Sequence, residues 1–274
     1  AVVTLFFGGA QMTTIPSTVT TDGFGAFTAS FVVPLVSTGS WSVRAQDSSG
    51  YQSTTTFTVG LNLVFSATRG VVGAIVTVNG LGFAPISLIT FTFDASVLPT
   101  TPSPIITDAL GIFQASFAIP ESTGQNHLIV VNDSAGNRVS TTFTVDESIS
   151  LNQSSGDVGT PVLIIGTGFR QDNYVTITFD SNLVVTVPNP VLANANGSFS
   201  ASFLVPDVTP GAKTIRATDT IGNSATASFT VTPAISLSPA TGRGGTTTTI
   251  TGTGFALLST VIIKFNGNTI LTAP

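Results

Sequence analysis

The sequence repeats itself with a period of 86 residues, and this period constrains the fold more than any other feature. Phe-Thr-Val triplets, further phenylalanines and Gly-Phe pairs all recur at that spacing; they begin at Phe57, Phe143 and Phe229, at Phe7, Phe93, Phe179 and Phe265, and at Gly82, Gly168 and Gly254. A fixed period of this length is typical of a tandem array of small domains. We predict a partial domain over 1–60, complete domains over 61–146 and 147–232, and a partial domain over 233–274.

The two outer segments cover different parts of the repeat. Segment 1–60 corresponds to the later strands of a domain, and segment 233–274 to the early strands. A tail of this size buries too little core to be stable alone, and an open sheet edge tends to pair with another chain. Two alternatives stay open: the segment belongs to a longer continuous array, or the tail of one subunit completes the head of the next by strand complementation. Residues 1–16 and 259–274 cover the same repeat positions, which favours the longer array.

Short stretches of alternating apolar and polar residues predict β-strands in each copy. In copy 147–232, residues 174–180 and 199–205 alternate most clearly, and the turn residues 194–197 lie between them. Seven such strands without a helical period predict an all-β fold of tandem immunoglobulin-like β-sandwich domains. Phenylalanines at one-face positions are the expected core: Phe27, Phe31, Phe57, Phe113, Phe117, Phe143, Phe199, Phe203 and Phe229.

The start of each copy carries a more specific pattern. Residues 234–245 read Ala-Ile-Ser-Leu-Ser-Pro-Ala-Thr-Gly-Arg-Gly-Gly, and residues 249–255 read Thr-Ile-Thr-Gly-Thr-Gly-Phe. This pattern resembles the opening of IPT/TIG-type immunoglobulin-like domains, and the later halves resemble the Ig-like repeats of large prokaryotic surface proteins. The resemblance implies the fold and a bacterial or archaeal cell-surface setting in a stalk, adhesin, surface layer or filament. It implies no catalytic residues, because an Ig-like sandwich hosts many functions.

The composition excludes several classes of protein. Charged residues make up 8% of the chain, against about 25% in an average domain, and the net charge is −5. The eight Lys and Arg residues form no basic stripe, so we expect no nucleic-acid partner. The chain has no cysteine, which excludes disulfides, thiolate zinc sites and cysteine nucleophiles. No apolar run reaches the roughly 18 residues that span a membrane.

Two sets of polar residues are the main candidates for chemistry. His127 is the only histidine, but Trp41 and Lys213 occupy the same repeat position, so we interpret it as a half-exposed strand residue without a catalytic role. Asp47, Asp133 and Asp219 recur, each three residues before a glycine. Such an aspartate accepts backbone N–H bonds in a turn, and calcium ligation is a weaker alternative for the three carboxylates. Apart from calcium, we expect no metal and no cofactor.

Two further motifs have structural or modification-related interpretations. The Gly-Thr-Gly-Phe segments at 166–169 and 252–255 lead into another strand rather than a helix, so they indicate a tight bend and not a nucleotide loop. Three Asn-X-Ser sequons make Asn132, Asn152 and Asn196 glycosylation candidates if the protein is exported.

These observations predict a structural protein rather than an enzyme. We expect a subunit or segment of an extracellular filament, stalk or surface layer, whose partner is itself, head to tail or within a longer array. The alternative is an adhesin or carbohydrate-binding module on the cell surface, with surface glycans as partners. Sparse exposed aromatic residues argue against a repeated sugar-stacking platform.

Overall fold

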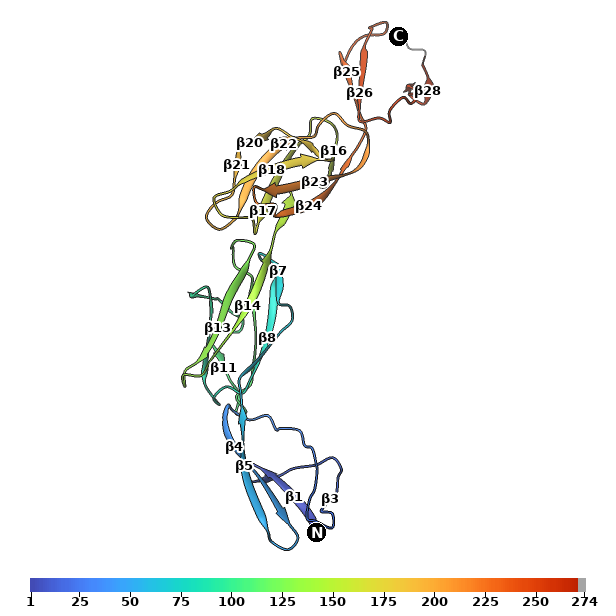
Figure 1. The fold of residues 1–274 in the computed structure, drawn as a ribbon. Coiled ribbons are helices and arrows are strands. Elements are labelled where there is room, and N and C mark those ends of the chain that lie inside the picture. The colour runs from blue at the N-terminus through green and yellow to red at the C-terminus, as the bar shows by residue number, and fades with distance from the viewer. Residues whose placement is uncertain (271–274) are drawn as a thin grey trace. The chain divides into compact units, whose positions relative to one another are not determined.

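The computed structural model describes residues 1–270, and these residues form β-strands and loops without a helix (Figure 1). The chain separates into two compact units. One comprises Ala1–Pro120 with Asn126–Thr144, and the other comprises Glu121–Gln125 with the described chain from Val145 onward. Since there is no helix among the described residues, none of them forms a helical membrane span.

Copy 147–232, in the second unit, contains two sheets. The first has the strand order β15-β17-β22-β20, and the second has the order β16-β24-β23-β18-β19, with β21 also paired to β18. The first sheet consists of β15 (Ser148–Leu151), β17 (Pro161–Thr167), β22 (Phe199–Leu204) and β20 (Thr186–Val187). The second consists of β16 (Ser155–Gly156), β24 (Ser224–Val231), β23 (Gly211–Asp219), β18 (Tyr174–Phe179), β19 (Asn182–Leu183) and β21 (Val191–Leu192).

Copy 61–146 has the same plan. Its first sheet has the order β12-β8-β6, and its second has the order β10-β9-β13-β14-β7, with β11 also paired to β9. The first sheet consists of β6 (Asn62–Phe65), β8 (Ile75–Leu81) and β12 (Phe113–Ala118). The second consists of β7 (Arg69–Val71), β9 (Leu88–Phe93), β10 (Ser96–Val97), β11 (Ile105–Ile106), β13 (Asn126–Asp133) and β14 (Arg138–Asp146).

In copy 147–232, alternating side chains from the two sheets meet in one hydrophobic core. Every second residue of β22 is buried, starting at Phe199. Phe203 from the first sheet and Phe179 from the second lie 6.2 Å apart between ring centroids, and Phe229 lies 6.0 Å from Phe179. Each such ring contributes roughly 1.5–3 kcal/mol when it is fully buried. The protein is therefore an all-β chain with immunoglobulin-like β-sandwiches in tandem, which confirms the predicted fold class.

One short strand differs from the sequence-based expectation. The Ser-Ser-Gly-Asp stretch at 154–157 has the composition of a turn, but Ser155 and Gly156 form β16 and pair in parallel with Thr230 and Val231 of β24. The chain thereby passes from the edge of one sheet to the edge of the other. A pairing of two residues is too short to leave an alternating pattern, so local sequence could not reveal it.

The outer segments are less complete. Segment 1–60 forms one sheet of order β2-β1-β4-β5 with β3 paired to β1, and segment 233–270 forms two separate two-stranded sheets. The strands of the first are β1 (Val2–Phe7), β2 (Ala10–Gln11), β3 (Val19–Thr20), β4 (Gly39–Asp47) and β5 (Gln52–Val59). The strands of the second are β25 (Ala234–Ser238), β26 (Thr249–Thr253), β27 (Lys264–Phe265) and β28 (Asn268–Thr269).

The expected core phenylalanines are buried in the two complete copies but partly exposed in segment 1–60. In copies 61–146 and 147–232 all six are at most 5% exposed: Phe113, Phe117, Phe143, Phe199, Phe203 and Phe229. Phe31 is half-buried and packs against Val3, Leu5 and Val19. Phe27 and Phe57 differ from the expectation, since they are 41% and 42% exposed. No second sheet covers them within segment 1–60 as described.

Candidate functional site

The recurring aspartates form one kind of site, a carboxylate held by N–H donors at the end of a hairpin. Oδ1 of Asp133 accepts hydrogen bonds from the backbone N–H groups of Ala135 (3.0 Å) and Asn137 (2.9 Å). Oδ2 accepts from the backbone N–H of Ala84 (2.9 Å) and from Nδ2 of Asn137 (2.7 Å). The carboxylate thereby ties the turn after β13 to the segment that follows β8.

Asp219 repeats this arrangement. Its Oδ2 accepts from the N–H of Arg170 (3.1 Å) and from Nδ2 of Asn223 (2.9 Å), while its Oδ1 accepts from the N–H groups of Ile221 and Asn223. Donors around both oxygens supply the stabilisation that a cation would otherwise give. Among residues 1–270, no cluster of three or more His, Asp or Glu side chains is arranged to hold a metal ion. The geometry therefore favours the turn interpretation of these aspartates over the calcium alternative.

The hydrogen bonds of Asp133 give a pH-dependent stability. Burial raises the pKa of this carboxyl, but the donors from Ala84, Asn137 and Ala135 outweigh burial and hold the pKa below its ordinary value. The lowered pKa stabilises the folded protein above the pKa of the unfolded chain, and this stabilisation is lost as the pH falls through the lowered pKa. We expect the hydrogen-exchange protection of β13 and β14 to fall over this acidic range, and to fall less in Asp133→Asn. An equal acid dependence in the variant would contradict this assignment.

A second acidic position also belongs to a turn. Oδ1 of Asp108 accepts from the N–H groups of Leu110 (2.8 Å) and Ile112 (2.9 Å). Asn194 takes the same place in copy 147–232, and its Oδ1 accepts from the N–H groups of Asn196 (2.9 Å) and Ser198 (3.0 Å). Because a neutral amide replaces the carboxylate with the same bonds, this position requires an acceptor and no negative charge.

The structure corrects the interpretation of His127. Its side chain is 3% exposed, stacks on Phe93 at 4.7 Å between ring centroids, and lies with Nδ1 2.5 Å from Oδ2 of Asp94. The position is therefore buried and paired. Both partners of this pair belong to copy 61–146.

The equivalent positions also lie together in the other copies. Lys213 pairs with Asp180 in copy 147–232, with 3.3 Å between Nζ and Oδ2. In segment 1–60 the same two positions hold Trp41 and Gly8, and a Cβ on Gly8 would lie 2.8 Å from the indole ring. The signal in the sequence is that an aspartate accompanies His127 and Lys213, whereas a glycine accompanies Trp41. A comparison of Trp41, His127 and Lys213 alone indicated a freely variable position. It missed the pairing of each with a second residue.

The Gly-Thr-Gly-Phe segments lie where backbones approach closely. A Cβ on Gly168 would lie 2.5 Å from the carbonyl oxygen of Asp146. In the first unit the N–H of Thr38 donates to the carbonyl of Gly82 (2.6 Å), and in the second unit Thr123 forms a parallel bridge with Gly168. This geometry supports the interpretation of a tight bend.

The three sequon asparagines occupy different settings. Asn132 lies in β13 and is half-buried. Asn152 is exposed, and its Oδ1 accepts from the N–H of Leu163 (2.8 Å). Asn196 is exposed in the hairpin turn before β22. Ser198 of that sequon is buried, and its hydroxyl has no hydrogen-bond partner among the described residues. Accessibility therefore favours Asn196 and Asn152 over Asn132.

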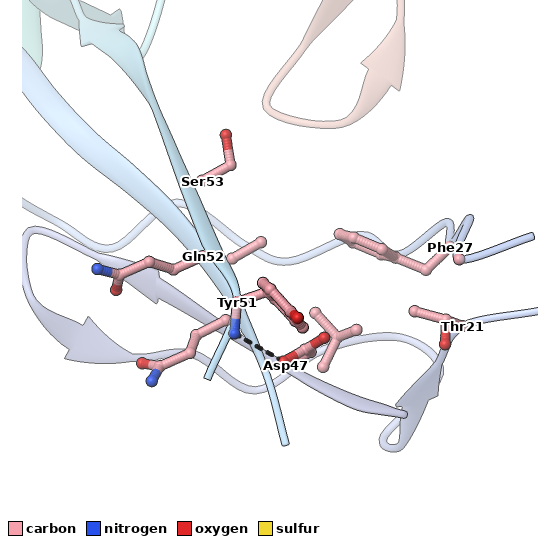
Figure 2. A pocket seen from close by; sticks show the side chains of 10 residues that line it. Thr21, Phe27, Asp47, Tyr51, Gln52 and Ser53 are labelled. Atoms are coloured by element: carbon pink, nitrogen blue, oxygen red, sulfur yellow. Dashed lines mark hydrogen bonds between the residues drawn. The ribbon is translucent and has the colours of Figure 1, made fainter. Parts of the chain in front are cut away.

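The last candidate is an open groove of about 240 Å³ in segment 1–60. Figure 2 shows its lining: Phe27 and Thr21 lie across from Asp47, the last residue of β4, and Tyr51, which directly precedes β5. Oδ1 of Asp47 accepts from the N–H groups of Ser49 and Tyr51, each at 2.9 Å. The exposed Phe27 and this carboxylate give the groove one apolar wall and one hydrogen-bond acceptor.

Comparisons by sequence find no relatives. No protein-family model matches this chain, and no curated protein matches it. Comparisons by structure find immunoglobulin-like chains of low similarity. The adhesin InvE of Yersinia pseudotuberculosis is 19% identical with a TM-score of 0.30; the match covers 62% of this chain and 58% of InvE. A tetra-tandem repeat from the extending region of a large adhesion protein is 17% identical with a TM-score of 0.29, covering 86% and 69%.

A further structural match is the Escherichia coli adhesin FdeC, at 12% identity and a TM-score of 0.27, covering 85% of this chain and 86% of FdeC. For InvE, the match spans less than three fifths of the length of the solved structure. Similarities at these identities and TM-scores carry no argument about activity or partners. The fold assignment above rests on the sheets and cores of this chain itself.

Proposed function

We propose that this chain is a structural, non-enzymatic segment of an extracellular stalk, filament or surface layer. In this proposal each 86-residue copy is one Ig-like domain of the IPT/TIG type, with boundaries at 1–60, 61–146, 147–232 and 233–274. The observation that carries the proposal is that the same β-sandwich recurs at a fixed spacing. Each sandwich contains one buried aspartate, Asp133 or Asp219, that bonds its own turn to a distant loop. Tandem copies of one domain form an extended structure, and in this proposal none of the copies carries a reactive site of its own.

The titratable groups support a structural role. The side chains that sequence analysis singled out are engaged in turns or pairs: Asp133 and Asp219 with N–H donors, and His127 with Asp94. The surface is rich in Thr and Ser and poor in charge. Neutral hydroxyl side chains keep a strand-rich surface hydrated without a strong field that would attract nucleic acid or acidic lipid.

We also propose that subunits join head to tail by strand complementation. The open face of segment 1–60 exposes Phe27 and Phe57, and the two-stranded sheet β25–β26 exposes Ile235 and Leu237. These are the later and the early parts of the same repeat. A head-to-tail contact of this kind does not close on itself and therefore builds a filament. Glycans on Asn152 and Asn196 would decorate this filament on its exposed turns.

Electron microscopy of the purified chain tests the proposal. We expect fibres or elongated rods whose length shortens on dilution, because end-to-end association follows mass action. A compact, monodisperse globule at every concentration would contradict the filament. A hydrolase screen supplies the control for the non-enzymatic assignment: turnover that disappears in Asp133→Asn would contradict it.

A further inference from the structure

We infer that an N-linked glycan on Asn152 lies across the outer face of the first sheet of copy 147–232 and covers an aliphatic strip on that face. The strip consists of Leu163, Ile165, Val187 and Leu204. The inference rests on the proposed extracellular setting and goes beyond the structural role, because it assigns the modified atom and the surface that the modification covers. All residues that carry it belong to a complete copy.

The strip crosses three neighbouring strands of the sheet. Buried and exposed residues alternate in β17 and β22, so Leu163, Ile165 and Leu204 point away from the core. Leu163 lies opposite Ser202 of β22, and Ser202 lies opposite Val187 of β20. The four aliphatic side chains are exposed, from 39% for Leu163 to 71% for Val187. A contiguous exposed apolar surface with a polar rim marks a site that another group covers.

Asn152 stands at the edge of this strip, in the same row as Leu163. Its backbone N–H donates to the carbonyl of Leu163 (3.1 Å), and its Oδ1 accepts from the N–H of Leu163 (2.8 Å). The side chain is thus held through the oxygen, the atom that N-glycosylation leaves unchanged. Within residues 1–270, Nδ2 forms no hydrogen bond and is available to a sugar. The row from Asn152 to Val187 crosses three strand spacings, about 14 Å, which a short oligosaccharide spans.

The sequon is open to a transferase. Asn152 and Ser154 are both exposed, whereas the hydroxyl of Ser198, in the sequon at Asn196, is buried. In the transfer, Nδ2 of Asn152 forms a bond to C1 of an oligosaccharide carried on a lipid phosphate. The C1–O bond of this donor breaks, the lipid phosphate leaves with the electron pair, and Nδ2 gives up one proton to a base of the transferase.

The aliphatic strip accompanies the sequon among the copies. At the Asn152 position copy 61–146 has Ser66, whose Oγ accepts from the N–H of Thr77 (2.9 Å), so the bond to the next strand is kept without a sequon. Segment 233–270 has Ser238 there, opposite Thr249. The strip positions of copy 61–146 hold Thr77, Asn79, Thr101 and Ala118, and the first two hold Thr249 and Thr251 in segment 233–270. The face is therefore aliphatic where asparagine replaces serine.

The chemistry of the strip fits a sugar chain. Ser150 and Ser200 lie on either side of Ile165, and Ser202 lies beside Leu163, so hydroxyl and aliphatic groups adjoin on this face. A pyranose ring carries C–H groups on its faces and hydroxyl groups around its edge. The C–H groups pack on aliphatic side chains, which removes both from water, while the hydroxyl groups bond to serine.

Occupancy of the sequon is the first test. The protein is secreted from a host with an oligosaccharyltransferase, and its peptides are examined by mass spectrometry. We expect a glycan on Asn152 and its loss in Ser154→Ala, which removes the sequon but keeps the bond from Asn152 to Leu163. An unmodified Asn152 in a chain that carries sugar on Asn196 would overturn the inference and leave the proposed glycosylation standing. A chain without any sugar would contradict both.

Hydroxyl-radical footprinting tests whether the glycan covers the strip. We expect oxidation of Leu163 and Ile165 to be several-fold slower in the glycosylated chain than in Ser154→Ala at the same dilution. Ile221, in the turn after β23, is 61% exposed and is the control, oxidised equally in both chains. Equal rates at the strip would overturn the inference: two fast rates would mean that the glycan extends into solvent, and two slow rates that a protein surface covers the strip.

A swap of the strip residues tests the same point in the unglycosylated chain. We expect Ser154→Ala to bind more of a hydrophobic dye than the glycosylated protein does. Adding Leu163→Thr and Ile165→Thr, the residues of segment 233–270, should return dye binding to the glycosylated level, and threonine keeps the β-branching that suits a strand. Equal dye binding by Ser154→Ala and the glycosylated protein would contradict the inference. Fibres in the microscope depend on the chain ends and not on this glycan, so the filament and the glycan cover fail separately.

Discussion

Replacing Phe229 with alanine is expected to lower the free energy of unfolding of copy 147–232 by about 3–5 kcal/mol. Phe229 is fully buried in β24, and its ring lies against Phe179 of β18. The substitution removes apolar contact and leaves a cavity that the two sheets cannot close, because strand pairing fixes their backbones. Hydrogen exchange of the intact chain, read on peptides from β22 to β24, measures the loss.

Phe57→Ala is the matched control, since Phe57 occupies the same repeat position in segment 1–60. It is 42% exposed, so the same substitution removes less buried surface and should cost clearly less in the dilute, monomeric protein. Equal losses at the two positions would show that Phe57 is covered in solution. An unchanged protection of β24 in Phe229→Ala would contradict the position of Phe229 in the core.

Asp219→Ala is the second substitution with a large expected effect. Asp219 is 4% exposed and accepts hydrogen bonds from the N–H groups of Arg170, Ile221 and Asn223 and from the side chain of Asn223. Alanine leaves these donors without their acceptor, at about 1–3 kcal/mol for each donor that stays buried. We expect a loss of about 3 kcal/mol or more, seen as faster exchange at residues 168–172 and 219–223.

Asp47→Ala is the control for this substitution. Within residues 1–270, the carboxylate of Asp47 accepts only from the N–H groups of Ser49 and Tyr51, both exposed, and so its replacement should cost less. Thermal unfolding with and without calcium distinguishes the alternative role. A calcium-dependent rise in stability that disappears in Asp219→Ala would identify a ligand and contradict the turn assignment. An unchanged unfolding temperature in calcium agrees with it.

Local sequence was sufficient for those parts of the fold that depend on side-chain alternation. The period-2 pattern of residues 174–180 and 199–205 predicted β18 and β22, and the lack of any helical period predicted an all-β chain. The turn chemistry of Asp133 and Asp219 was also foreseen, because an aspartate three residues before a glycine closes its own hairpin. These features depend on residues close together in the chain.

Features that depend on distant residues were missed. His127 was interpreted as half-exposed, but its environment depends on Asp94, which lies 33 residues earlier. The short parallel pairing of β16 with β24 joins residues about 75 positions apart and leaves no local pattern. The recurring aspartates gave no sign that their Oδ2 atoms bond to the segment after the Gly-Phe pair. All three are cross-strand contacts that exist only after the sheets have formed.

The sequence by itself determined the period, the strand positions and the fold class, because alternation and turn residues act over a few positions. The tertiary structure alone decided which of the equivalent residues are covered. Phe27 and Phe113 share a repeat position, yet one is 41% and the other 4% exposed. The physical reason is that burial is a property of two facing sheets. A phenylalanine can carry the pattern of a core residue, but only the strand across from it removes its ring from water.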